Sequence, residues 1–127
     1  MPYNFISGDV LRVVFYGRLC FADLSAALSD LARAEASQIQ ARDQLIDLTT
    51  VTQNDLTGAD IEQTVYHHRH RFQNPVRSAF AAPHLVDYGM ARMFQIRNEQ
   101  PDIHIAVFHT LAEAEAWLAS GGKDLGI

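Results

Sequence analysis

Hydrophobic and polar positions alternate with a period of two at the start of the chain. Residues 3–6 and 10–16 both have the composition of strands, and Ser7-Gly8-Asp9 between them is typical of a hairpin turn. Within the second run, Leu11, Val13 and Phe15 share one face. Gly17 is expected to end this strand. The chain is therefore predicted to open with a β-hairpin.

From Phe21 onward the hydrophobic spacing changes to three and four residues. Leu24, Leu28 and Leu31 predict an amphipathic helix from Phe21 to about Ala36. Three strand–helix units should follow. The first has a strand at 44–48, a Thr-rich loop, and a helix that begins near Thr57, carries Ile61, Val65, His68 and Phe72 on one stripe, and cannot continue past Pro75. The second has a strand at 76–82 and a helix at 85–99, and the third has a strand at 103–108 and a helix at 110–119. Thr110 and Glu113 fit a capping box for the last helix.

This order predicts an α/β fold with one mixed five-stranded sheet and about four helices. The opening hairpin supplies an antiparallel strand, and the alternating strands and helices supply a parallel sheet covered by helices. We expect residues 1–120 to form a single domain and residues 121–127, which follow Ser120, to form a flexible tail.

Charge and composition narrow the classes of function. The formal net charge is -5, and Lys123 is the only lysine among ten basic residues, so neither nucleic-acid binding nor a polybasic membrane anchor is expected. The single cysteine, Cys20, cannot form an internal disulfide. The first residues lack the pattern of a signal peptide, and no apolar run approaches about 18 residues. These features predict a cytoplasmic protein.

Two stretches of the chain resemble the STAS superfamily. Residues 45–58, with the sequence LIDLTTVTQNDLTG, resemble the strand and loop of the anti-sigma-factor antagonists, although Leu56 stands where those proteins have a first serine. Residues 81–94, with AAP followed by YGMARMF, together with EAEAWL at 113–118, resemble the SpoIIAA-like branch, which has also been compared with the lipid-binding CRAL-TRIO fold. The resemblance implies a STAS-like, SpoIIAA-like fold. It also places Thr57 on the serine that a kinase phosphorylates in the antagonists, with Asp55 and Gly58 in register.

The carboxyl ends of the parallel strands are a second candidate site. Ligands of open α/β sheets usually bind at this edge, where helix N-termini favour anions. Arg18, Pro83, His84 and His109 are expected there, and a partner or an anion could bind to them. Thr57 and Thr110 can equally be plain helix caps, which is the interpretation we favour.

Two further groups of residues suggest chemistry less strongly. His67 and His70 are three residues apart on one helix face, a spacing that suits two imidazole ligands of a metal, but a third ligand is not evident and zinc normally requires four. The helix at 85–99 has apolar residues on more than one face, and Tyr88, Met90, Met93 and Phe94 are candidates for an apolar interface or cleft.

No nucleophile elbow, phosphate-binding loop or dinucleotide fingerprint is present, so neither an enzyme nor a cofactor is expected. The first hypothesis is a STAS-like regulatory module that binds a protein partner, which includes a homodimer. It requires a filled core and an exposed patch. The alternative is a carrier or sensor of a small nonpolar ligand, acting in solution or at a membrane surface. It requires an apolar cavity or cleft beside the third helix.

Overall fold

The computed structural model describes residues 3–6, 10–36, 43–71, 76–97 and 103–120. Its elements, in chain order, are β1 (Tyr3–Ile6), β2 (Val10–Leu19), α1 (Phe21–Ala36), β3 (Asp43–Asn54), α2 (Gly58–Arg71), β4 (Val76–Ala81), α3 (Leu85–Arg97), β5 (Ile103–Phe108) and α4 (Leu111–Ala119). The expected α/β architecture with five strands and four helices is confirmed among the described residues. The expected tail at 121–127 lies outside them.

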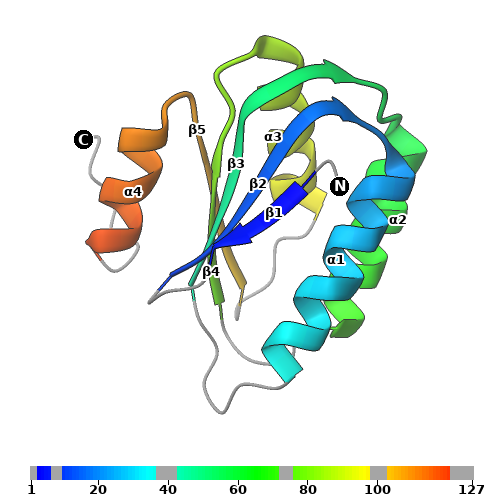
Figure 1. The fold of residues 1–127 in the computed structure, drawn as a ribbon, viewed down its shortest axis with the longest axis horizontal. Coiled ribbons are helices and arrows are strands. Elements are labelled where there is room, and N and C mark those ends of the chain that lie inside the picture. The colour runs from blue at the N-terminus through cyan, green and yellow to red at the C-terminus, as the bar shows by residue number, and fades with distance from the viewer. Residues whose placement is uncertain (1–2, 7–9, 37–42, 72–75, 98–102, 121–127) are drawn as a thin grey trace.

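The strands form one mixed sheet in the order β1-β2-β3-β4-β5. β1 runs antiparallel to β2, and the other neighbouring pairs are parallel. Because right-handed crossovers between successive neighbours all pass over the same face, α1, α2 and α3 cover one side of the sheet. α4 packs alone on the opposite side (Figure 1).

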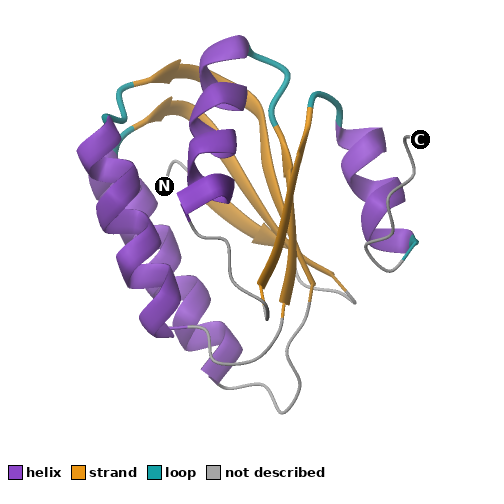
Figure 2. Cartoon of the chain, turned by 180° about the vertical axis from the view of Figure 1, so that it is seen from behind, coloured by secondary structure: helices purple, strands orange, loops and turns teal. Residues whose placement is uncertain are grey.

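Each side of the sheet has its own core. On the side of α1, α2 and α3, the largest cluster joins Leu11, Val13 and Phe15 of β2 to Leu48 and other buried residues. On the other side, Trp117 and Leu118 of α4 pack against alanines of β4 and Leu45 of β3. The view from behind in Figure 2 shows this helix separated from the other three by the sheet. Because successive side chains of a strand point to opposite faces of the sheet, one strand can contribute residues to both cores.

Two sequence expectations about β2 and β3 are wrong. Gly17 does not end β2, because it lies within the strand at a φ of 73°, between irregularities in the register with β3. Glycine adopts this conformation without a steric cost, which suits a β-bulge. Residues 49–54 are not a loop, because they continue β3 and pair with residues 16–19 of β2.

Candidate functional site

The carboxyl ends of β2, β3, β4 and β5 lie along the upper edge of the sheet in Figure 1, where each strand passes into a helix. Two of the sequence-predicted groups lie at this edge: Asp55, Thr57 and Gly58, and Arg18, Pro83, His84 and His109. The structure divides them into separate local clusters instead of one concave site.

Arg18 and Asp55 form an ion pair at the ends of β2 and β3. Gln53 Nε2 also donates to Asp55 at 2.9 Å, and the Asp55 N–H donates to the carbonyl of Leu19 at 2.9 Å. The hydrogen bond from Gln53 and the bond and charge of Arg18 lower the pKa of Asp55, while the same carboxylate raises the pKa of Arg18. Arg18 is exposed, yet its Nε is already bonded to a carboxylate and is not free for an external anion.

Thr57 caps α2 through a reciprocal pair of hydrogen bonds. Its hydroxyl accepts from the N–H of Asp60 at 3.2 Å, while its own N–H donates to the Asp60 carboxylate at 2.9 Å. This is a capping box with Asp in the third helical position. Asp55, Thr57 and Gly58 are all exposed, so the Thr57 hydroxyl is accessible to a modifying enzyme. Its phosphorylation stays a prediction.

A buried carboxylate anchors α3 to this edge. Asn54 Nδ2 donates to Asp87 Oδ1 at 2.8 Å, and Asn54 Oδ1 accepts from the N–H of Leu56 at 3.0 Å. Asp87, in the first turn of α3, is only 3% exposed. This pair was not predicted from the sequence, although an acidic residue among apolar neighbours at the start of a helix is a signal that points to it.

Pro83 and His84 are exposed in the turn that precedes α3. His109, just after β5, stacks on the ring of Tyr88 with centroids 3.9 Å apart and an interplanar angle of 8°. His109 is therefore packed beside α3 and separate from the Arg18–Asp55 pair. The structure places the predicted residues along the carboxyl edge of the sheet, in separate local contacts.

The outer face of α3 carries four of the six large hydrophobic residues that are exposed in the described part of the chain, and the other two are Tyr16 and Tyr66. Leu85 is 83% exposed, Val86 67%, Ile96 62% and Met93 37%. Asp87, Ala91 and Phe94 of the same helix are buried. Of the four candidates chosen from the sequence, only Met93 therefore belongs to an exposed face, while Tyr88 and Met90 are half-buried.

A cavity of about 50 Å³ lies between the sheet and the three helices on its face. The part of its wall that the structure describes is apolar except for Thr64 and consists of Val13, Phe15, Leu19, Leu24, Ala27, Ile46, Leu48, Ile61, Thr64, Phe80, Met90, Ala91 and Phe94. Protein interiors are usually packed without such voids. At about 24 cal/mol per Å³, an unfilled space of this size costs about 1 kcal/mol of stability.

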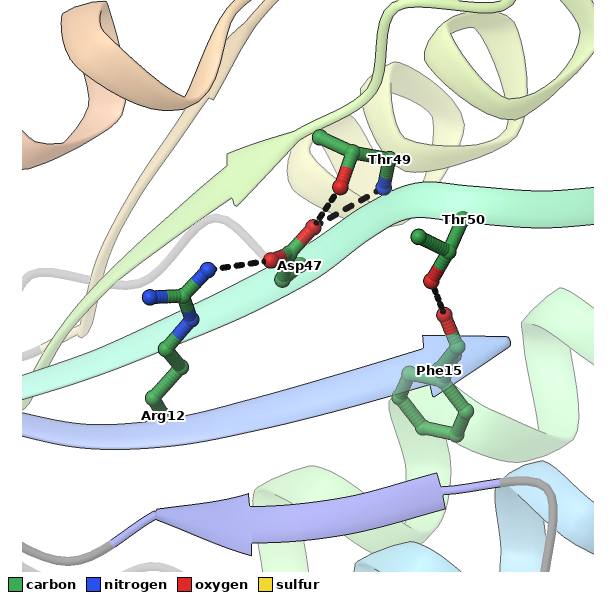
Figure 3. Close-up of polar contacts among 5 residues, drawn as sticks. All are labelled: Arg12, Phe15, Asp47, Thr49 and Thr50. Carbon is green, nitrogen blue, oxygen red and sulfur yellow. Dashed lines mark hydrogen bonds and ion pairs between the residues drawn. The ribbon is translucent and has the colours of Figure 1, made fainter.

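A polar cluster joins β2 and β3 (Figure 3). Because Arg12 and Asp47 alternate along their strands with the cavity residues Val13 and Ile46, the cluster lies on the face of the sheet opposite the cavity. Arg12 Nη2 donates to Asp47 at 2.6 Å, and the N–H and hydroxyl of Thr49 donate to the other oxygen of this carboxylate at 2.9 and 2.5 Å. Burial raises the pKa of Asp47, but the bonds from Thr49 and Arg12 outweigh burial and lower it overall. The cluster thus holds a buried carboxylate in its charged form.

The candidate metal ligands His67 and His70 gain no support from the described residues. The backbone of His67 and His70 lies in α2, but their side chains are outside the described part of the structure. No group of three His, Cys, Asp or Glu side chains within the described ranges could hold a metal ion.

Cys20 Sγ donates to Asp23 at 3.0 Å at the start of α1. Among the described helices, none is long and apolar enough to cross a membrane.

Comparison of the sequence with protein-family models and with curated proteins finds no match. Comparison with solved structures finds an uncharacterised protein of the DUF3478 family from Shewanella loihica PV-4, whose crystal structure is described as having a SpoIIAA-like fold. The two chains are 20% identical, each is covered over 91% of its length, and the TM-score is 0.58. This similarity shows the fold alone. The chain has the SpoIIAA-like fold that its sequence motifs predict.

Proposed function

We propose that this protein is a non-enzymatic, STAS-like regulatory module that binds a protein partner through the outer face of α3. The observation that carries the proposal is the row of exposed apolar side chains on this helix. A cytoplasmic location is part of the same proposal. The SpoIIAA-like fold agrees with it but does not determine function, since one fold hosts many activities.

The exposed residues of α3 share one face. Residues 85, 89, 93 and 96 follow spacings of four, four and three, and residue 86 lies beside them. We call Leu85, Val86, Gly89, Met93 and Ile96 the α3 stripe. Exposed apolar surface gathered in this way is characteristic of interaction sites, whereas single exposed apolar residues are common everywhere.

The surroundings of the α3 stripe also resemble an interface. Two exposed arginines flank it: Arg92 donates to Gln95 at 2.5 Å, and Arg97 donates to Glu62 of α2 at 2.8 Å. An apolar centre with a polar rim is the usual anatomy of a docking surface. Gly89 is exposed at the centre of the stripe, and a Cβ there would meet nothing within 4 Å, so a partner side chain can approach the helix backbone.

Affinity purification from the cells that make the protein tests this proposal. Tagged wild-type protein is compared with Ile96→Asp, which places a charge in the stripe, and with Ala116→Asp, a matched change near the end of α4 on the opposite side of the sheet. Quantitative mass spectrometry should find a partner, or an untagged second copy, retained by wild type and Ala116→Asp and lost from Ile96→Asp. Equal recovery with all three proteins would refute the proposed surface.

The cavity favours a second candidate function, the carrier or sensor of a small nonpolar ligand. Met90, Ala91 and Phe94 of α3 contribute to its wall, as this hypothesis requires. Its volume of about 50 Å³ is a third of the roughly 150 Å³ that holds benzene in an apolar protein cavity. In this conformation of the protein, the cavity therefore accommodates only a small ligand and is too small for a lipid chain.

Xenon titration followed by NMR of methyl groups tests the second candidate. Methyl signals of Leu48 and Met90 should shift with saturation, while those of Leu118, on the far side of the sheet, should not. Absence of any shift at Leu48 and Met90 under xenon pressure would exclude a usable cavity. Native mass spectrometry of freshly purified protein would complement this titration, because one spectrum reports both a retained ligand and the number of subunits.

A further inference from the structure

The side chain of Gln44 is almost completely buried, with 1% of the residue exposed. Its Oε1 accepts a hydrogen bond from the hydroxyl of Ser78 at 3.2 Å, but its Nε2 has no hydrogen-bond partner. Buried donors are nearly always paired, because an unmade bond leaves the full cost of removing the group from water. The free amide N–H therefore requires an explanation.

Gln44 is not part of the cavity wall, but it lies one row along the same face of the sheet from two residues that are. Gln44 of β3 is paired with Ser78 of β4, and the next pair on the same sheet face is Ile46 with Phe80. Ile46 and Phe80 both line the cavity. Successive rows on one face of a sheet are about 7 Å apart, so a molecule of a few heavy atoms can span the distance from the cavity to the Gln44 amide.

Among the described residues of the cavity wall, Thr64 alone is polar, and its hydroxyl already donates to the carbonyl of Asp60 at 2.8 Å. Among the described residues in and next to the wall, the Gln44 amide is thus the donor left for a ligand. Binding sites for small molecules commonly combine apolar walls with one or two polar groups that fix orientation. An apolar cavity with one free N–H beside it matches that pattern.

We propose that the cavity binds a small, mainly apolar molecule with one hydrogen-bond acceptor, such as a carbonyl oxygen, which accepts from Nε2 of Gln44. This inference rests on the second candidate function and specifies its ligand class. The apolar part of the ligand fills the space beside Ile46 and Phe80. Met90 and Leu24 are half-buried, and the flexible thioether of Met90 allows the space to adapt to somewhat larger ligands.

The test uses acetone and 2-methylpropene, which have the same shape and differ by a carbonyl oxygen in place of a methylene group. Both are titrated into ¹⁵N-labelled protein, and NMR follows the backbone and the side-chain amide of Gln44. Acetone should shift the Gln44 NH₂ signals, whereas 2-methylpropene should shift the wall residues alone. Water also forms hydrogen bonds with the acetone oxygen, so the ratio of the two affinities in one protein does not measure the bond to Gln44. The ratio in the wild-type protein is therefore compared with the ratio in a variant that lacks the amide.

The matched variant is Gln44→Met, which keeps the length of the side chain and removes the amide. The affinity for acetone relative to 2-methylpropene should fall about fivefold in this variant, the effect of one ordinary hydrogen bond. If both molecules bind, the ratio is unchanged and the wild-type Gln44 amide does not respond, the polar anchor is wrong but the cavity remains a ligand site. If neither molecule binds wild-type protein, both the inference and the second candidate function fail.

Discussion

Phe94 and Ile96 lie on opposite sides of α3. Phe94 is 6% exposed and forms part of the cavity wall, whereas Ile96 is 62% exposed and belongs to the α3 stripe. Two residues apart on a helix correspond to a rotation of about 200°, so one helix can serve a ligand cavity and a docking surface at once. The two candidate functions therefore share an element and can be tested with separate substitutions.

The cavity can be tested by filling it. Val13 lines the cavity and is 2% exposed, so Val13→Ile should place its extra methylene in empty space and raise the free energy of unfolding by about 0.5 to 1 kcal/mol. Val51 is equally buried but is not part of the cavity wall, so Val51→Ile should overpack the core and cost about 1 kcal/mol or more. Urea unfolding measures both changes. Equal destabilisation by the two variants would show that the space is not present in solution.

Replacement of Gly89 by alanine should have opposite effects on the stability of the protein and on its binding of a partner. It is an exposed position in the middle of α3, and an added Cβ would clash with nothing. Gly89→Ala should therefore stabilise the protein by about 0.5 to 1 kcal/mol through helix propensity, measured by thermal or urea unfolding. The same methyl group fills the centre of the α3 stripe and should weaken partner binding. A stabilised variant that binds its partner normally would place the contact elsewhere.

The Asp47 cluster predicts how stability depends on pH. The folded-state pKa of Asp47 lies below its ordinary value of 3.8, so the ionised carboxylate stabilises the fold above that pH. This contribution is lost as the pH falls through the lowered pKa. Asp47→Asn should be less stable than wild type by about 2 kcal/mol at neutral pH, because Arg12 loses its charged acceptor.

Urea unfolding of the two proteins across the acidic range checks this sign. The difference between wild type and Asp47→Asn should be constant above about pH 5 and should shrink below about pH 4, since protonation of the unfolded carboxyl near 3.8 removes the advantage of the native pair. A difference that stays constant down to pH 2 would contradict the lowered pKa.

Thr57 should behave as a helix cap whether or not it is modified. Its hydroxyl accepts from the N–H of Asp60, so Thr57→Ala should cost about 1 kcal/mol and Thr57→Ser much less. Phosphopeptide mapping of protein from its own cells tests the second role. A phosphate on Thr57 would add about two negative charges beside the Asp60 carboxylate and two residues after Asp55 in the sequence, and this added charge would oppose docking of a partner at this edge. Unmodified Thr57 under all growth conditions would leave only the cap.

Much of the fold could be predicted from the sequence because each element has a clear period. Leu11, Val13 and Phe15 alternate along β2, and Ile61 and Val65 lie on the buried side of α2 as predicted. The last helix begins after Thr110, whose hydroxyl accepts from the N–H of Glu113 at 3.2 Å. These signals come from residues that are close together in the sequence, so they can be recognised without knowledge of the tertiary contacts.

The predictions that were wrong concern segments whose structure depends on contacts with residues far away in the sequence. Residues 49–54 are mostly polar, and they form a strand because β2 continues through Gly17 and pairs with them. Within α3, apolar residues face both sides, so composition could not distinguish the exposed Leu85 from the buried Phe94. The free amide of Gln44 could not be predicted either, because it depends on what the neighbouring strand and helices fail to provide.

Site-specific photo-crosslinking in living cells measures partner docking on α3 most directly. A photoreactive amino acid replaces Val86 in the α3 stripe or, as the control, Ala116 on α4, and adducts are identified by mass spectrometry. Docking through α3 predicts one dominant adduct at position 86, its loss when Ile96→Asp is added, and no such adduct at position 116. Adducts that form equally at both positions, or that persist with Ile96→Asp, would contradict it.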